Sequence, residues 1–317
     1  MSSAPEPQWY RSPVPADVLQ VLSKRSTVRG VLHLLLHVLL LLVTGSLVVM
    51  LGLGQHWVAF LMALCVHGAA FGFLGYAGLG HELAHRTVFA DRRLSDSMFL
   101  LVSFLTWNNP VYFRKSHRLH HRFTLDPAID GEVPVPQASL LRAWPQLLLL
   151  DVPFLLRALR IGWQNANDVV KGSFGERLFP QGSDDRRRLV RWARLLLAGQ
   201  LGLAVVFVVS GLWPLLFAVT LAPFFCTFPS RVLAQAQHYG MQAGSSDFRT
   251  CCRTVVLHPV LAFLYWQMNY HVEHHMYPGV PYFNLARLHC LIAADLPPPT
   301  GGLRSLLTIM ATERGQR

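Results

Sequence analysis

The stretch Tyr270-His271-Val272-Glu273-His274-His275-Met276-Tyr277-Pro278 places three histidines within five positions. The same H-x-x-H-H spacing occurs at His117-Arg118-Leu119-His120-His121, and a two-histidine box, His81-Glu82-Leu83-Ala84-His85, lies further upstream. Core packing does not call for eight imidazoles in three groups, whereas imidazole is a common metal ligand. The three boxes therefore predict a metal site, and the segments between them decide how the chain assembles it.

The composition of the chain is typical of a membrane protein. Hydrophobic residues make up 52% and charged residues only 14% of its 317 residues. Soluble domains carry about a quarter charged residues. The five cysteines form no C-x-x-C pair, so we interpret them as reduced thiols rather than as a disulfide framework or a zinc site.

Four apolar segments are interpreted as membrane spans. A helix rises about 1.5 Å per residue, so about 20 residues cross a hydrocarbon core of roughly 30 Å. Prolines at 214, 223 and 229 should bend the last segment, which membrane helices tolerate. The predicted spans are residues 31–54, 57–79, 191–212 and 213–230.

Three further apolar stretches are not read as spans. Residues 94–107 are too short to cross, and residues 255–268 are short as well, so we expect the latter in the interface. Residues 139–161 are long enough, but they contain Arg142, Asp151 and other charges that are costly at the bilayer centre. We therefore expect helices that lie in the membrane interface.

The positions of the basic residues support this topology. Residues 1–30 carry 4 Lys/Arg, residues 86–194 carry 17 and residues 231–317 carry 7, which accounts for all 28. The two hairpin turns carry none, as the positive-inside rule requires. The net charge of +11 is thereby explained by anionic headgroups rather than by nucleic acid. Both termini and all three histidine boxes then lie on the cytosolic side.

The predicted fold is an all-α integral membrane protein, with four transmembrane helices in two hairpins and a cytosolic helical cap that holds the histidine-rich metal site. It comprises a cytosolic N-terminal segment (1–30), a membrane domain (31–296) and a cytosolic tail (297–317). The high leucine and arginine content is typical of a GC-rich bacterial genome, which would place the protein in a bacterial inner membrane.

Helix geometry indicates how the histidines divide. Residues i and i+4 share a helix face, so His81 with His85, His117 with His121, and His271 with His275 can each reach one metal. The added i+3 histidines, His120 and His274, can reach a neighbouring metal. Eight imidazoles exceed the four ligands of one structural zinc, so two metals with open positions are favoured.

The three boxes together resemble the membrane-bound fatty acid desaturase and hydroxylase superfamily, over about residues 57–290. The resemblance implies two non-haem irons per chain, O₂, a lipid acyl substrate and an external electron donor of ferredoxin, rubredoxin or cytochrome type. It also implies a further ligand, His238, just after the last span. Acyl-CoA desaturases of the family have an asparagine four residues earlier, where this chain has Ala234.

The resemblance implies an O₂-dependent oxidoreductase that introduces a double bond into an acyl chain. The alternative is a membrane di-iron hydroxylase of a lipid or another hydrophobic substrate, because both reactions use the same ligands. A remote alternative is a zinc protease, since His81-Glu82-x-x-His85 matches H-E-x-x-H with Glu82 as general base. That alternative leaves the other two boxes unexplained.

Carboxylates near the boxes are candidates for orienting the histidines. Metal-bound imidazoles usually give their second N–H to a carboxylate or a carbonyl, and Asp126 and Glu273 are our candidates for that role. Asn108 and its neighbours could line a substrate tunnel. Apart from the box histidines and His238, the remaining histidines are interpreted as structural. They are His33, His37, His56, His67, His258 and His289.

Overall fold

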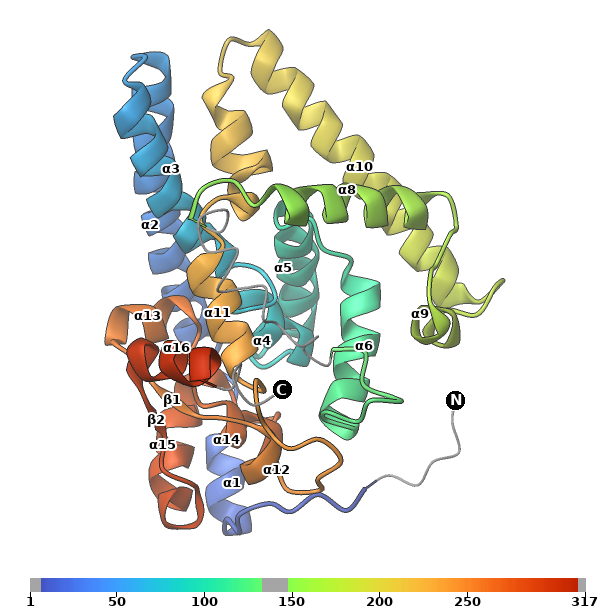
Figure 1. The fold of residues 1–317 in the computed structure, drawn as a ribbon, viewed down its shortest axis with the longest axis vertical. Helices are drawn as coiled ribbons and strands as arrows, with labels where there is room; N and C mark the ends of the chain where they lie inside the picture. Colours follow the sequence, from blue (N-terminus) through green and yellow to red (C-terminus); the bar gives the residue numbers. More distant parts are fainter. Residues whose placement is uncertain (1–6, 133–147, 313–317) are drawn as a thin grey trace.

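A computed structural model describes residues 7–132 and 148–312. The fold is mostly helical (Figure 1). In its upper part lie α2 (Thr27–Leu53), α3 (Trp57–Gly72), α10 (Asp184–Val209) and the segment after α10. The histidine boxes lie in the lower part, the cap. It includes α1 (Ala16–Leu22), α4 (Leu79–His85), α5 (Arg92–Leu105), α6 (Pro110–Arg122) and the C-terminal helices.

Within residues 7–132 and 148–312, two helices are long and apolar enough to cross a membrane, α2 and α10. Only 22% and 17% of their apolar windows are buried inside the protein, unlike the core helices of soluble proteins. Leucine and valine side chains such as Leu39 and Val206 are more than half exposed. An apolar surface of this extent needs a hydrocarbon environment. The structure thus supports membrane association with two candidate membrane helices, and it does not confirm the prediction of four transmembrane helices.

The second predicted span is shorter than expected, because α3 ends at Gly72 rather than at residue 79. Glycines at positions 72, 75 and 78 follow, and glycine is a poor helix former. Gly78 is also required sterically. A Cβ there would lie 2.3 Å from the carbonyl oxygen of Phe73. The chain turns at this point and starts α4.

The fourth predicted span is not one continuous helix. A π-helix at Leu216–Thr220 and a 3-10 helix at Ala222–Phe224 are followed by a break, and α11 (Phe228–Ala236) starts afterwards. Pro223 contributes to the break because it has no N–H and obstructs the preceding turn. Gly68 of α3 lets this segment approach closely, since a Cβ there would lie 2.4 Å from the Phe225 carbonyl oxygen.

Residues 148–161 form no helix of spanning length, and their place in the membrane interface stays a prediction; residues 139–147 of that prediction lie outside the described part of the chain. Helix α8 (Val152–Ala166) packs across α10 and its apolar side chains Leu156, Leu159 and Trp163 are exposed along one face. In Figure 1 it runs crosswise between the upper helices and the cap. It is followed by α9 (Ser173–Leu178).

The rest of the cap comes from the C-terminal part of the chain. After α11 follow α12 (Phe248–Cys251), α13 (Pro259–Leu264), α14 (His271–Met276), α15 (Tyr282–Ile292), the 3-10 helix η3 (Ala293–Asp295) and α16 (Gly302–Thr312). Strands β1 (Val255–Val256) and β2 (Thr300–Gly301) pair in parallel, Val255 with Thr300. The apolar stretch 255–268, which we expected in the interface, comprises β1 followed by α13. The largest buried core cluster surrounds α4, α5 and α14.

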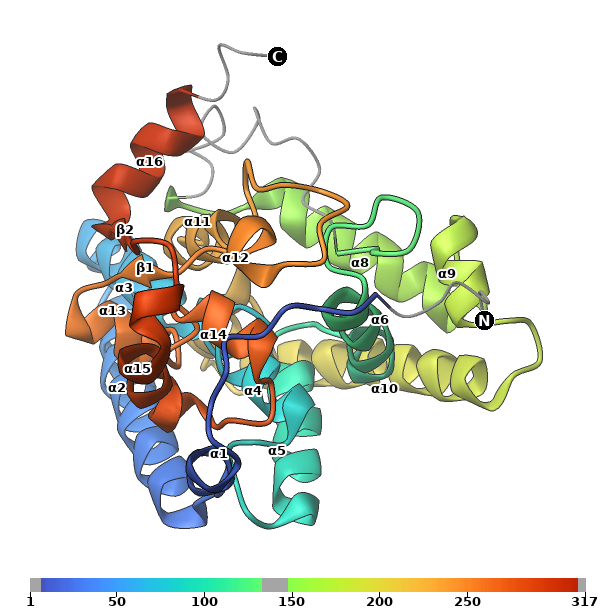
Figure 2. The ribbon, with the colours of Figure 1, turned by 90° about the horizontal axis from the view of Figure 1, so that it is seen from below.

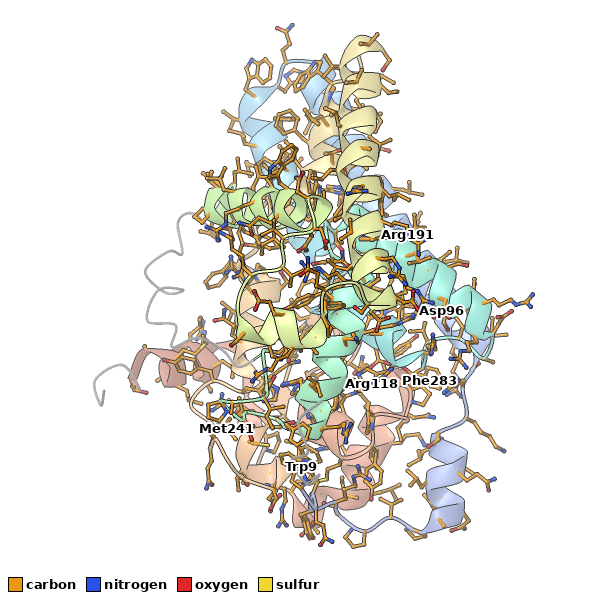
Figure 3. The ribbon with its side chains drawn as sticks, turned by 90° about the vertical axis from the view of Figure 1, so that its right-hand side faces the viewer. Trp9, Asp96, Arg118, Arg191, Met241 and Phe283 are labelled. Atoms are coloured by element: carbon orange, nitrogen blue, oxygen red, sulfur yellow. The ribbon has the colours of Figure 1, made fainter. Side chains whose placement is uncertain are left out.

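A polar contact fixes the first two boxes relative to each other. Asp96 of α5 receives hydrogen bonds from Arg86, at the end of α4, and from Arg114 of α6, at 2.8 and 2.5 Å. Arg86 adopts a left-handed backbone conformation (φ 59°) that ends α4. Figure 3 labels Asp96 between the upper helices and the lower end of the cap.

The N-terminal segment lies across the cap. Residues 8–14, which we call the strap, run from α1 past α14 toward α6 (Figure 2). The Tyr10 amide donates to the Ser246 carbonyl at 2.9 Å, and the hydroxyls of Tyr10 and Ser12 both donate to Asp295 at 2.7 Å. The Tyr277 hydroxyl donates to the Ser12 carbonyl at 2.6 Å. The strap is thus tied to the last third of the chain.

Candidate metal centre

Short helices carry each histidine box. Helix α6 begins with Asn109, whose side chain accepts hydrogen bonds from the amides of Val111 and Tyr112. Pro110 occupies its first turn, where a missing N–H costs nothing. The second box therefore falls on the last turn of α6, while the first box lies on α4 and the third on α14. His238 lies just beyond α11.

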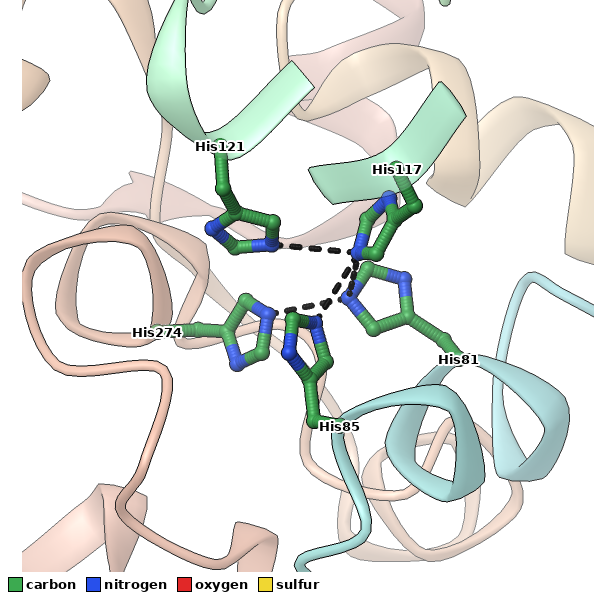
Figure 4. Close-up of side chains that lie close together, drawn as sticks. All are labelled: His81, His85, His117, His121 and His274. Atoms are coloured by element: carbon green, nitrogen blue, oxygen red, sulfur yellow. Dashed lines mark hydrogen bonds between the residues drawn. The ribbon is translucent and has the colours of Figure 1, made fainter. Parts of the chain in front are cut away.

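The nitrogens of five histidines converge on one point (Figure 4). Their potential ligand atoms all lie within 4.8 Å of one another, and we call this group the five-histidine cluster. The Nε2 atom of His117 lies 3.1, 2.9 and 3.1 Å from the Nε2 atoms of its three nearest members, so it cannot satisfy all of them by hydrogen bonding. The members are His81, His85, His117, His121 and His274.

A second group of four histidines lies beside the first. It consists of His120, His238, His271 and His275, all buried, and we call it the four-histidine cluster. The Nε2 atoms of His238 and His271 are 2.9 Å apart. The rings of His121 and His275, one from each cluster, stack with centroids 4.2 Å apart. The two candidate metal positions are therefore neighbours.

The division of histidines is the one that helix periodicity predicts. The two histidines of each i, i+4 pair belong to the same cluster, whereas the i+3 histidine of a box belongs to the other cluster. His120 joins the cluster opposite to His117 and His121, and His274 joins the cluster opposite to His271 and His275. All nine histidines named from the sequence are thus brought together. That they bind metal remains a prediction.

Outer partners orient several of these rings. His117 donates from Nδ1 to Glu132 at 2.9 Å, and His120 donates from Nδ1 to Asp130 at 2.8 Å. His238 donates from Nδ1 to the carbonyl of Cys251 at 2.8 Å. In each ring Nε2 then keeps its lone pair and faces the cluster. This pattern is typical of metal-ligating histidines.

An unpartnered nitrogen of His275 strengthens the fit to metal ions. Thr124 donates its hydroxyl proton to the His120 carbonyl, so its oxygen accepts from His275 Nδ1 at 3.2 Å. The Nε2 atom of His275 is buried and has no hydrogen-bond partner in the described part of the chain. A buried lone pair directed into a cluster of others is costly unless a cation satisfies it.

The electrostatics of the clusters also suit a cation. Burial, together with neighbouring imidazoles, lowers the pKa of His81 and His274 well below the usual value, and burial lowers the pKa of His238 to about 3. Neutral imidazoles are the form that binds metal. For His120, burial acts in the same direction, but the charge and hydrogen bond of Asp130 outweigh it and raise the pKa.

The carboxylates that orient the rings are not the two expected from the sequence. Asp126 accepts from the amides of Ala128 and Ile129 and caps a turn. Glu273 binds the Thr254 hydroxyl and His289, neither of which belongs to a cluster. The carboxylates that contact the clustered imidazoles are instead Asp130, Glu132 and Glu82.

Asp130 and Glu132 orient histidines of the second box, and Glu82 lies behind the third. Glu82 Oε2 accepts from the Thr87 hydroxyl at 2.8 Å, while its Oε1 lies 3.7 Å from His274 Nδ1. A protease base would have to face the metal-bound water. Glu82 faces the outer side of a ring, so the structure does not support the zinc protease interpretation. The close spacing of Asp130 and Glu132 after the second box was the only sequence signal for this role.

Histidines outside the clusters are structural, as expected. His33 stacks on Phe263 and Trp266 with centroids 4.2 and 4.0 Å away. His37 accepts from the Trp266 indole at 3.2 Å, and His67 lies between Thr44 and the Ala218 carbonyl. His258 caps α13, and His289 binds Glu273.

A cavity of about 180 Å³ lies between α3, α8 and α11. Ala234, one turn before His238, is part of its wall. So is Tyr76, whose ring stacks on Phe113 at 3.6 Å, and Phe113 in turn stacks on His117 at 4.7 Å. Asn108 lines the cavity as expected. The cavity wall therefore connects with both clusters.

The comparison with protein families gives one match. The profile of the fatty acid desaturase family matches residues 55–305, about four fifths of the chain. All nine clustered histidines and the three carboxylates behind them fall within this range, whereas α2 and the strap precede it. The comparison with curated proteins found no match.

Proposed function

Because the chain belongs to the fatty acid desaturase family, we propose that it is an O₂-dependent membrane oxidoreductase that uses two irons to introduce a double bond into a lipid acyl chain. The observation that carries the proposal is the pair of adjacent clusters, with five and four convergent imidazoles. Imidazole also accepts zinc and copper, so the choice of iron rests on the family and on the need to activate O₂.

The proposed reaction balances with an external source of electrons. Two neighbouring methylenes, O₂, two electrons and two protons give a –CH=CH– unit and two waters. Bound iron would supply the redox chemistry that breaks an unactivated C–H bond. Hydroxylation would consume the same O₂, electrons and protons and would give one alcohol and one water.

Hydrogen-bond acceptors in the chain orient the imidazole rings. Asp130, Glu132 and the Cys251 carbonyl hold Nδ1 protons, so the ring nitrogens face the metal positions before any ion arrives. Seven of the nine histidines are buried, and only His85 and His121 are half-buried. A buried and preset ligand shell limits access of bulk water to the reacting carbon.

We further propose that the acyl substrate enters through the cavity between α3, α8 and α11. Its wall joins the stack from Tyr76 to His117, and it adjoins α8, whose exposed apolar face suits the membrane interface. Ala234 leaves room where acyl-CoA desaturases carry an asparagine. The rest of the proposed topology, with both termini in the cytosol, follows from the charge distribution.

Metal and lipid analysis would test the proposal. The purified protein should contain close to two irons, and lipids of a naive expression host should lose two hydrogens. His274→Ala should abolish the change, whereas His258→Ala, outside the clusters, should not. A gain of one oxygen would indicate hydroxylation instead. An active protein without iron would contradict the metal assignment.

A further inference from the structure

We propose that the electron donor is an acidic one-electron carrier protein that docks on the cap around Trp9, where an aromatic stack leads from the strap into the metal centre. The inference rests on the proposed function, because an O₂-dependent oxidoreductase of this kind needs two electrons from outside for each double bond. Trp9 lies outside the part of the chain that the family profile matches.

The aromatic stack consists of ring contacts that run from the strap to both clusters; its Phe248 and His275 rings are tilted by 52° rather than parallel. The rings of Trp9 and Phe248 are parallel within 7° and their centroids are 4.2 Å apart. The ring centroids of Phe248 and of His275, in the four-histidine cluster, are 5.4 Å apart. His275 stacks on His121 of the five-histidine cluster with ring centroids 4.2 Å apart. Electron tunnelling is faster through packed atoms than across a gap, so this contact chain is a favourable entry route.

The strap holds the outer end of this stack in place. The Trp9 indole N–H donates to the carbonyl of Arg122 at 2.9 Å, at the end of the helix that carries the second box. Trp9 is half-buried, whereas Phe248 is only 1% exposed, so the tryptophan is the member of the stack that a partner can touch. Figure 3 labels Trp9 near the lower end of the molecule, opposite the upper helices.

The surface around Trp9 is basic. Arg11 is exposed two residues along the strap, and Arg118 and Arg122 are exposed on one face of α6. The nearby acids Asp247 and Asp295 are both bound to Arg249, whose single charge offsets one of the two. Asp185 lies near Arg118 and is itself paired with Lys115, so positive charge remains in excess. A basic surface attracts and orients an acidic partner, and small contact areas are typical of transient redox complexes.

Each encounter would transfer one electron. The carrier is oxidised by one electron while the metal centre gains one, so two encounters supply the two electrons that the proposed reaction consumes. No bond is formed between the proteins. The contact therefore has to be brief, and rim charges with a single central aromatic residue meet that need.

Trp9→Ala in the iron-loaded, membrane-embedded protein tests the route. A reduced plant-type [2Fe–2S] ferredoxin serves as the acidic probe, and dithionite serves as a reductant that needs no docking. We expect Trp9→Ala to lose most of the maximum rate of reduction by ferredoxin while its reduction by dithionite stays unchanged. Trp9→Phe retains a ring against Phe248 and should recover most of the rate. Equal rates for Trp9→Ala and the parent would overturn the route.

Charge reversal tests the docking surface separately. Arg118→Glu should raise the ferredoxin KM about tenfold at low salt, with little effect on the maximum rate, and added salt should reduce the difference. Arg287→Glu makes the same change of charge on the exposed side of α15, at the opposite edge of the cap in Figure 2, and should leave KM unchanged. An equal effect of both variants would contradict a defined docking surface.

The outcomes also separate this inference from the proposed function. If the chain is not an iron oxidoreductase, the parent protein will contain no reducible iron and dithionite will yield no modified lipid. If the function holds and the route is wrong, the parent will be active and the Trp9 and Arg118 variants will accept ferredoxin electrons as the parent does.

Discussion

Replacing Asp130 by asparagine would probe how far the outer carboxylates set metal affinity. Asp130 is 5% exposed and accepts three hydrogen bonds. One oxygen receives His120 Nδ1 at 2.8 Å and the Leu125 amide at 2.9 Å, and the other receives the Glu132 amide at 2.9 Å. The side chain therefore fixes both a ring of the four-histidine cluster and the turn after the second box.

The structure gives the size of the expected effect. Asparagine has one acceptor oxygen, which preserves two of the three bonds if it occupies the position next to His120, but it faces the Glu132 amide with a donor. It also removes the negative charge beside the ring. Loss of such an outer partner lowers metal affinity about 10–100-fold, which corresponds to about 1.4–2.7 kcal/mol.

Iron content after titration with a chelator measures the effect, and the chain offers a matched control. Asp126→Asn changes a carboxylate only four residues away, which caps the turn through Ala128 and Ile129 and touches no clustered imidazole. Asp130→Asn should release iron at about 10–100-fold lower chelator activity than the parent, and Asp126→Asn should not. Equal retention by the parent and Asp130→Asn, or equal loss by both variants, would refute the assignment of Asp130.

Three other perturbations have defined outcomes. Gly68→Ala would place a methyl group against the Phe225 carbonyl and should lower the stability of the fold by about 1–3 kcal/mol. Gly202→Ala, which has open space around the new methyl group, should be neutral or stabilising. Thermal midpoints measured in detergent compare the two variants. His238→Ala removes one of four ligands and should lower iron content below two per chain, as metal analysis will show. Hydrogen bonds from Ser12 and Tyr10 of the strap keep the pKa of Asp295 below its usual value. Their contribution to holding the strap against the cap is therefore complete above about pH 4 and is lost as the pH falls through the lowered pKa. The protection factors of the amides of residues 8–14, which correct for the intrinsic pH dependence of exchange, should therefore fall in acid and stay high at neutral pH.

The histidine clusters were the part of the site most accessible from the sequence. A period of 3.6 residues fixes which members of a box share a face, and this local rule does not depend on the rest of the fold. It was enough to divide His117 and His121 from His120 before any tertiary contact was known. His238 required the family resemblance, because a single histidine has no internal spacing to interpret.

The outer carboxylates depended on tertiary detail. Asp126 and Asp130 both follow the second box closely, and only the turn between them decides which one reaches a ring. Glu273 lies inside the third box, yet its side chain faces α15 and His289. Sequence proximity to a ligand does not specify the direction of a side chain, and this is why both candidates were wrong.

The spans were predicted with similar limits. Hydropathy locates apolar segments, but Gly78 and Pro223 determine where the helices stop, through a close contact and a missing N–H. The strap had no periodic signal at all. Its contacts link positions up to 285 residues apart, so only the folded structure could show them.

These distant contacts have a consequence for biosynthesis. Residues 8–14 are translated long before their partners Ser246, Tyr277 and Asp295. Contacts of such long range form late, because most of the chain has to be in place beforehand. A fusion tag that restrains this segment would thus interfere with a late step of maturation rather than with membrane insertion.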